Sequence, residues 1–438
     1  AHYATGGPAR DVAVVGDRAY LASEWAGLEI LDVSDPNLPT LLGACANIGP
    51  AQSILVDGQL AYVTAADWGV WVVNVADPLS PYCVGNYNTG GFARRAALAN
   101  GRLYVADGDN GLVILTVGEL VWSNPYGGYF DDPQNWTPAG PPGPGQRAIF
   151  NLPESYTVTF SQDAAHGSTI VQDGNVALDL GGFTYTLSDE YSLKVGVLPY
   201  YGATLAVTNG VLNARYAGLG DPADAYGELQ LSGVGTQLNL DPAFGYLDVG
   251  IYGAGLVGLA DGATLNSSVT KLGEWADSQG EVTLETGATM STWDLAVGIS
   301  GIGALTIASD ADVTNIHAFL AFGAGASGSA TVTGAGSTWV STDFLDMGRE
   351  GTATLLVEEG GLVKTTNDLK LGELPGAYAE LIVTGPDSRC ETEAGIVIVG
   401  VSGDADLNVQ AGGSIVTPGV LSATFGDSTG DIVVTGST

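Results

Sequence analysis

The sequence has few basic residues. It carries 13 Lys and Arg against 48 Asp and Glu in 438 residues, which gives a formal net charge of -35. A nucleic-acid-binding protein needs a basic surface to displace counterions from phosphates, so this class is excluded. An anionic membrane surface is an unsuitable partner for the same reason. The charge suits a soluble protein in a salty or Ca²⁺-rich exterior.

Cysteines and long apolar runs are also scarce. The three cysteines are Cys45, Cys83 and Cys390, too few for a disulfide scaffold. Cys45 and Cys83 could pair, and free buried thiols are an equal alternative, because cysteine often packs as a small hydrophobic residue. No secretory signal and no stretch of 18 apolar residues is visible, so we expect no membrane span. The chain starts at Ala1 rather than Met, so we expect a processed product or a portion of a longer polypeptide. Because the last residues stop inside a repeated phrase, we expect the biological polypeptide to continue past Thr438.

Glycine and apolar residues are abundant instead. There are 65 glycines, and hydrophobic residues make up 45% of the chain while charged residues make up 14%. This composition indicates many turns around a buried interior rather than a disordered acidic tail. No helical period of 3.6 residues lasts long enough to matter. We therefore expect an all-β protein with two or three domains.

Residues 1–118 repeat with a spacing of 42. Tyr20, Tyr62 and Tyr104 occupy the same place in RAYLAS, LAYVTA and RLYVAD. Each phrase precedes a second apolar run that opens with glycine: GLEILDVSDP (27–36), GVWVVNVADP (69–78) and GLVILTV (111–117). Alternating apolar runs between turn residues predict short antiparallel strands. About four strands per 42 residues are typical of a β-propeller blade.

These phrases resemble the bacterial LVIVD-type propeller repeat. The first two copies match its pattern well, and the third lacks the DP ending. The resemblance implies a partial propeller of three units, whereas a closed propeller usually needs at least four blades. Missing upstream sequence, divergent blades or another subunit could supply the rest, and we favour missing sequence.

Residues 119–151 form a joint between two repeat systems. The Pro/Gly run at 138–145 cannot hold a helix and indicates a linker or an extended loop. Five aromatic residues predict that the segment is nonetheless packed: Trp122, Tyr126, Tyr129, Phe130 and Trp136. We expect them to cap the open end of a following solenoid, because solenoids need their ends covered.

A second period, of about 25 residues, spans 152–438. A short phrase ending in glycine recurs at Gly250, Gly273, Gly298, Gly323, Gly348, Gly372, Gly400 and Gly426. Units of this length, with two or three short strands and tight turns, predict a right-handed parallel β-helix. Its coils would stack about 4.8 Å apart with Val, Leu, Ile and Ala inside. The pattern resembles the passenger domains of bacterial autotransporter-type adhesins.

Catalytic motifs are missing from the sequence. The densest cluster is Asp343, Asp346, Arg349 and Glu350, but a spacing of three places the two Asp on opposite faces of a continuous strand. The three histidines are isolated, and nothing matches a zinc site, a nucleophile elbow or a phosphate-binding loop. We therefore predict a protein that is not an enzyme and has no cofactor.

Two ligand interpretations remain. Asp107, Asp109 and Asn110 lie close together in DGDNG and could supply oxygen ligands to Ca²⁺, against the alternative of ordinary turn acidity. Trp339 could offer a stacking platform to a sugar, against the alternative of a large structural residue at a coil edge.

These observations favour a secreted or cell-surface structural protein that self-assembles into a filament, sheath or surface layer, or acts as an adhesive stalk. A homo-oligomer or polymer, surface glycans and other cell-surface proteins are the expected partners. The alternative is a glycan-binding or polysaccharide-degrading protein that uses a groove along the β-helix.

Overall fold

The computed structural model describes residues 1–99, 102–116, 119–137, 139–143, 145–422 and 428–435. Within these ranges the chain forms 49 β-strands and two short 3-10 helices, η1 (Gly108–Asn110) and η2 (Pro133–Asn135), so the all-β prediction is confirmed. None of the described helices has the length and apolar character that crossing a bilayer requires. The chain divides into two compact units, Ala1–Leu120 with Trp136–Gln146, and Val121–Asn135 with Arg147–Thr438.

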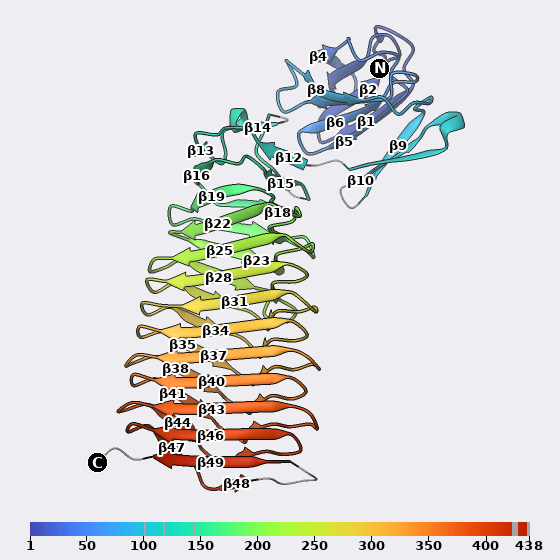
Figure 1. The fold of residues 1–438 in the computed structure, drawn as a ribbon. Helices are drawn as coiled ribbons and strands as arrows, with labels where there is room; N and C mark the ends of the chain where they lie inside the picture. Colours follow the sequence, from blue (N-terminus) through green and yellow to red (C-terminus); the bar gives the residue numbers. More distant parts are fainter. Residues whose placement is uncertain (100–101, 117–118, 138, 144, 423–427, 436–438) are drawn as a thin grey trace. The chain divides into compact units, whose positions relative to one another are not determined.

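The first unit contains three antiparallel sheets, one for each 42-residue repeat (Figure 1). The first blade is β1 (Asp11–Val15), β2 (Arg18–Ala22), β3 (Leu28–Asp32) and β4 (Thr40–Cys45). The second is β5 (Ser53–Asp57), β6 (Leu60–Thr64), β7 (Val70–Asn74) and β8 (Tyr82–Tyr87). The third is β9 (Arg95–Ala99), β10 (Arg102–Ala106) and β11 (Leu112–Thr116). Neighbouring strands along the chain pair in each sheet, as in a propeller blade.

Two apolar clusters join the blades. The cluster between the first and second blades contains Tyr20, Leu28, Ile30, Ile54, Val63 and Val73. The cluster between the second and third contains Tyr62, Val70, Leu103 and Val105. Because side chains alternate across a strand, the second blade uses one face toward the first blade and the other toward the third.

The second unit is a parallel β-solenoid of about 12 turns (Figure 1). Successive strands of a turn join three parallel sheets, which we call A, B and C in chain order. Sheet A contains β13 (Gly128–Tyr129), β16 (Ser155–Thr159), β19 (Gly174–Asp179), β22 (Gly202–Thr208), β25 (Tyr226–Ser232), β28 (Ala254–Ala260), β31 (Gln279–Leu284), β34 (Ile302–Ala308), β37 (Ser327–Thr333), β40 (Thr352–Glu358), β43 (Tyr378–Thr384), β46 (Asp404–Gln410) and β49 (Gly430–Thr435).

Sheet B contains β17 (Ala164–His166), β20 (Thr184–Leu187), β23 (Val211–Ala214), β26 (Gln237–Leu240), β29 (Thr264–Asn266), β32 (Thr289–Ser291), β35 (Asp312–Asn315), β38 (Thr338–Ser341), β41 (Leu362–Thr365), β44 (Arg389–Thr392) and β47 (Ser414–Val416). Sheet C contains β15 (Arg147–Phe150), β18 (Ser168–Val171), β21 (Leu193–Val195), β24 (Tyr216–Leu219), β27 (Tyr246–Val249), β30 (Val269–Leu272), β33 (Asp294–Val297), β36 (His317–Leu320), β39 (Leu345–Met347), β42 (Leu369–Leu371), β45 (Val397–Val399) and β48 (Val420–Ser422). The short strands β12 (Glu119–Trp122) and β14 (Trp136–Thr137) belong to the segment before β15.

Apolar ladders fill the solenoid interior. In sheet A, Leu205 of β22 pairs with Leu229 of β25, which pairs with Val257 of β28, and all three side chains are buried. Their neighbours along each strand are partly exposed, so every strand alternates between core and surface. In-register stacking of this kind gives each coil an apolar contact and a row of backbone hydrogen bonds with the next.

The corner after sheet C requires a left-handed backbone. At Gly250 φ is 69°, and a Cβ atom there would collide with the carbonyl oxygen of Gln279 in the next coil. Glycine is the residue that tolerates both conditions. The recurring glycine of the sequence pattern therefore has a steric origin.

Gly323, which the glycine repeat predicts at one of these corners, does not occupy it. Ala321, with φ of 55°, occupies this corner rather than Gly323. Its N–H donates to the Val297 carbonyl of the preceding coil, as the Gly298 N–H donates to the Leu272 carbonyl. The sequence repeat was therefore assigned to Gly323, two residues after the true corner residue. Gly426, the last predicted corner residue, lies outside the described residues.

Aromatic residues cover the first coils of the solenoid. Trp122 is buried and stacks on Tyr156, with ring centroids 6.2 Å apart, and Phe130 stacks on Phe160 at 4.6 Å. Tyr185 completes the Phe130 cluster at 5.4 Å. Of the other predicted cap residues, Trp136 is buried, whereas Tyr126 and Tyr129 are exposed and cap nothing.

Candidate functional site

Trp339, the predicted sugar-binding residue, is fully buried inside the solenoid. It lies on β38 at an inward position, between the partly exposed Thr338 and Val340. Its indole N–H donates a hydrogen bond to Asn315 of the preceding coil. A ring in the interior cannot stack on a ligand, so the binding interpretation of Trp339 is wrong and its role is structural.

Two of the predicted Ca²⁺ ligands, Asp107 and Asn110, are hydrogen-bonded to each other. Asp107 is fully buried, and its two carboxylate oxygens accept hydrogen bonds from Thr89 Oγ1 at 2.5 Å and from Asn110 Nδ2 at 2.9 Å. Asp109 is exposed in η1. In the described part of the chain, no group of three or more His, Cys, Asp or Glu side chains could hold a metal ion. Asp107 therefore anchors a loop of the third blade.

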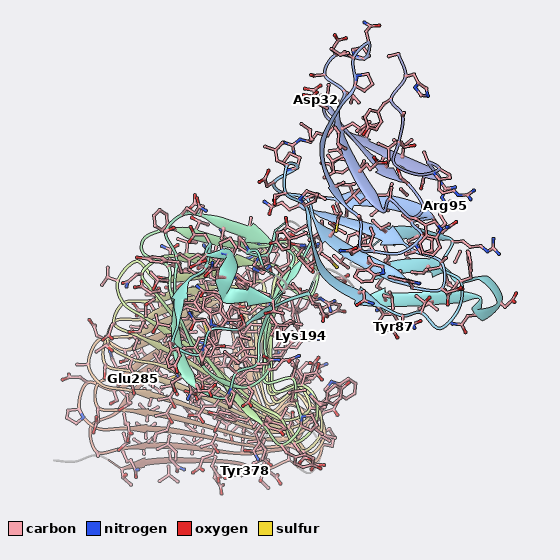
Figure 2. The ribbon with its side chains drawn as sticks, turned by 90° about the horizontal axis from the view of Figure 1, so that it is seen from above. Asp32, Tyr87, Arg95, Lys194, Glu285 and Tyr378 are labelled. Atoms are coloured by element: carbon pink, nitrogen blue, oxygen red, sulfur yellow. The ribbon has the colours of Figure 1, made fainter. Side chains whose placement is uncertain are left out.

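A line of charged and aromatic side chains runs along the outer face of sheet C. In-register pairing places one residue from each strand in this line, which we call the sheet C stripe: Lys194, Gly218, Asp248, Lys271, Ala296, Phe319, Asp346 and Lys370. Three of the chain's four lysines lie in it. Lys194 marks its position on the solenoid in Figure 2.

Asp248 is the centre of the first charged cluster of the stripe. Lys271 Nζ lies 3.5 Å from Asp248 Oδ1 and 2.9 Å from Glu274 Oε1, so one cation joins two carboxylates. The same Nζ lies 5.3 Å from the centre of the Tyr246 ring, which is a cation–π contact. Asp248 is buried although it points away from the core, because the surrounding side chains exclude water from it.

Asp346 is the centre of an equivalent second cluster. Lys370 Nζ lies 3.3 Å from Asp346 Oδ1 and 5.5 Å from the centre of the Phe344 ring. Glu373 comes three residues after Lys370, as Glu274 comes three residues after Lys271. Its Oε2 atom lies 3.6 Å from Arg349 Nε. Asp346 is buried like Asp248.

Burial raises the pKa of both aspartates to about 6. In each case desolvation is the largest cause, the neighbouring lysine lowers the pKa, and the nearby glutamate raises it again. Both carboxyl groups therefore begin to bind protons about two pH units above an ordinary aspartate.

The residues between the two clusters are also paired. His317 Nδ1 lies 2.7 Å from Asp294 Oδ1, and its Nε2 lies 3.3 Å from Asp343 Oδ2. The strand β39 begins only at Leu345, so Asp343 and Asp346 are not on one continuous strand as the sequence analysis assumed. His317, isolated in the sequence, is brought between two carboxylates by coil stacking.

Exposed aromatic rings flank the stripe. Tyr252 and Trp275 stack with ring centroids 5.5 Å apart and an interplanar angle of 14°, and both are exposed. Ring faces beside carboxylates and ammonium groups are the surface chemistry that binds the apolar faces and hydroxyl groups of sugars.

The lysine partners of Asp248 and Asp346 were not predicted from the sequence, because each lies one coil away from its aspartate. A signal was present: LDVG (247–250) is followed by KLGE (271–274), and LDMG (345–348) is followed by KLGE (370–373). In both copies the aspartate and the lysine share a register position in adjacent strands. A search for one motif followed by the other at one coil length would have found both.

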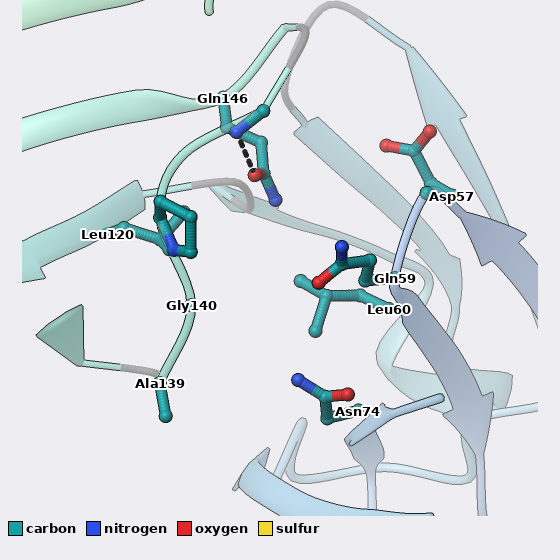
Figure 3. A pocket seen from close by; sticks show the side chains of 11 residues that line it. Asp57, Gln59, Leu60, Asn74, Leu120, Ala139, Gly140 and Gln146 are labelled. Atoms are coloured by element: carbon teal, nitrogen blue, oxygen red, sulfur yellow. Dashed lines mark hydrogen bonds between the residues drawn. The ribbon is translucent and has the colours of Figure 1, made fainter. Parts of the chain in front are cut away.

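A cavity of about 240 Å³ lies within the first unit. Figure 3 shows Gln59, Leu60 and Asn74 of the second blade opposite Leu120 and Gln146. The Gly143 N–H donates to Gln146 Oε1 at 2.8 Å on one wall. Among the described residues that line it, Asp57 is the one ionisable residue, so these residues offer no acid–base pair.

The three cysteines are free thiols. Cys45 is half-buried, Cys83 is exposed and Cys390 is buried. Burial raises the pKa of Cys390 to about 12, which leaves this thiol protonated and unreactive.

Comparison with known proteins identifies part of the chain. The LVIVD repeat family matches residues 6–47, 48–89 and 90–125, which are the three blades and the segment after them. No curated protein and no solved structure matches the chain. The LVIVD resemblance of the N-terminal repeats is confirmed.

Proposed function

We propose that the chain is a non-enzymatic structural protein of the cell surface or the exterior, which self-assembles into a filament, sheath or surface layer, or acts as an adhesive stalk. The proposal depends above all on the three parallel sheets that continue through about 12 turns. Bending such a solenoid would break backbone hydrogen bonds in several sheets at once, so the unit is a stiff spacer. The acidic composition suits an exterior location. The autotransporter-like repeat pattern supports the same assignment.

The two buried aspartates of the stripe are too far apart to act together as the two catalytic carboxylates of a polysaccharide-cleaving enzyme. Asp248 and Asp346 are four coils apart, which is roughly 19 Å at about 4.8 Å per coil. Paired catalytic carboxylates of glycosidases are about 5–9.5 Å apart. Each aspartate is instead ion-paired with a lysine, which serves cohesion between coils.

Native particle size tests the structural role. Light scattering and negative-stain microscopy of the full chain, over a range of protein and Ca²⁺ concentrations, should show regular particles larger than one chain. Monomers under all conditions would overturn the proposal.

A second candidate function is glycan binding along sheet C, favoured by the Tyr252–Trp275 stack beside the charged clusters. A glycan array combined with a reducing-sugar assay tests it. Trp275→Ala should abolish binding without affecting folding, whereas Phe244→Ala, at an exposed position on a solenoid turn, should leave binding unchanged. Release of reducing sugar would show an enzyme instead.

A further inference from the structure

The three blades can be compared position by position, because equivalent residues are 42 apart. On the side that faces the following blade, Tyr20 and Tyr62 are buried in the two blade–blade clusters. Tyr104, the equivalent residue of the third blade, is only half-buried. The third blade therefore has the side chain for this contact without the contact itself.

Two neighbouring positions show the same difference more strongly. Leu28 and Ile30 of the first blade are 0% exposed, and Val70 of the second is 2% exposed. In the third blade, Leu112 is 62% exposed and Ile114 is 52% exposed. We call Tyr104, Leu112 and Ile114 the third-blade face.

The opposite end of the stack is open as well. Val12 of the first blade is 56% exposed, whereas its equivalent Ile54 is 6% exposed against the first blade. Ala9 is exposed, whereas Ala51 and Ala93 at the same position are fully buried. We call Ala9, Val12 and the adjacent, 63% exposed Val14 the first-blade face.

We propose that the third-blade face of one copy of this chain binds the first-blade face of a second copy. The two faces repeat the chemistry of the two sides that already meet between blades, so the new contact continues an interface present twice within each chain. The proposal rests on the proposed self-assembly and names the surface responsible for it.

Charge supports the same pairing. Asp11 Oδ2 of the first blade accepts a hydrogen bond from the Ile54 N–H of the second at 3.2 Å. The equivalent residue of the third blade is Arg95, which is exposed. In the proposed contact Arg95 would lie beside Val12 of the second copy, next to its Asp11. Arg95 of one copy and Asp11 of the other would attract each other at this contact. Basic residues are scarce in the chain, so this pairing of opposite charges supports the proposal.

Single-face variants of the full chain test this contact by analytical ultracentrifugation. Wild type should self-associate through this contact, and Ile114→Glu or Val12→Glu should each weaken association at least tenfold. Both positions are exposed, so the variants should keep the wild-type circular dichroism. Val234→Glu, at an exposed solenoid turn, is the matched control and should associate like wild type.

Mixing the two variants gives the decisive result. An Ile114→Glu chain keeps a normal first-blade face, and a Val12→Glu chain keeps a normal third-blade face, so the mixture should regain dimers with one intact contact. A monomeric wild type, or no recovery on mixing, would overturn the proposal. Assembly that persists in both variants would overturn it while leaving the structural role intact, because another surface would then be responsible.

Discussion

Trp339 Nε1 donates a hydrogen bond of 2.7 Å to Asn315 Oδ1, one coil earlier, and both side chains are buried inside the solenoid. Asn315 Nδ2 donates in turn to Ser341 Oγ at 2.9 Å. The three residues form a polar link between two coils of an otherwise apolar interior. Because both side chains are buried, neither could form a hydrogen bond with bulk water if its partner were removed. The link therefore stabilises the fold by pairing polar groups that would otherwise be buried without a partner.

Substitution of either partner should destabilise the solenoid. We expect Trp339→Ala to lower the free energy of unfolding by about 3–5 kcal/mol through a cavity, and Asn315→Ala by about 1–3 kcal/mol through an unpaired indole N–H. Chemical denaturation measures both. Trp293→Ala removes an exposed indole and should change stability by about 0.5 kcal/mol or less. Equal losses at Trp293 and Trp339 would contradict the buried link.

Asp107 should stabilise the third blade without a metal ion. Asp107→Ala leaves the Thr89 hydroxyl and the Asn110 amide without their shared acceptor, so we expect a loss of about 1–3 kcal/mol. Asp109→Ala is the matched control, since Asp109 is exposed, and should have little effect. Thermal melting in EDTA and in CaCl₂ should give the same midpoint for wild type. A higher midpoint in CaCl₂ that Asp107→Ala abolishes would restore the Ca²⁺ interpretation.

The architecture was predictable because its signals are local and periodic. The 42-residue spacing of Tyr20, Tyr62 and Tyr104 corresponds to the three blades, and the recurring glycine after sheet C corresponds to a left-handed corner. The pattern erred at Ala321, where the backbone accepts φ of 55° without glycine. Local sequence cannot show that exception, because the constraint comes from the neighbouring coil.

The candidate site was less predictable because it is made across coils. Asp248 and Lys271 are 23 residues apart in the sequence and become neighbours only through the parallel register of β27 and β30. Trp339 illustrates the opposite error. Composition around it indicated an edge residue, whereas strand alternation places it inward and buries it.

The two kinds of corner residue allow a paired test of backbone strain. Gly250→Ala should destabilise the solenoid, because its Cβ would collide with the Gln279 carbonyl. Ala321→Gly should instead stabilise the solenoid by up to about 1 kcal/mol, because it removes the cost of an alanine in the left-handed conformation. The greater entropy of glycine in the unfolded chain reduces this gain. Urea denaturation of both variants measures the difference. A stable Gly250→Ala protein would show that the corner adjusts and is not sterically fixed.

Asp248 and Asp346 should make folding stability depend on pH. Burial raises both pKa values to about 6 in the folded state, from an ordinary value of 3.8. Between these two values the folded protein binds more protons than the unfolded chain, so this contribution to stability is greatest below about pH 4 and is lost as the pH rises through 6. Each aspartate should contribute roughly 3 kcal/mol to the change.

Urea denaturation of wild type and of the Asp248→Asn/Asp346→Asn double variant, at a series of pH values from 4 to 7, isolates this contribution. Other carboxylates titrate in both proteins, so their effects cancel in the difference between the two curves. The double variant should lose the decline in stability between pH 5 and 7, because an amide has no proton to release. Asp277→Asn, at an exposed turn of the same unit, should keep the wild-type dependence. Parallel curves for wild type and the double variant would show that the two aspartates titrate normally and that water reaches them on the sheet C stripe.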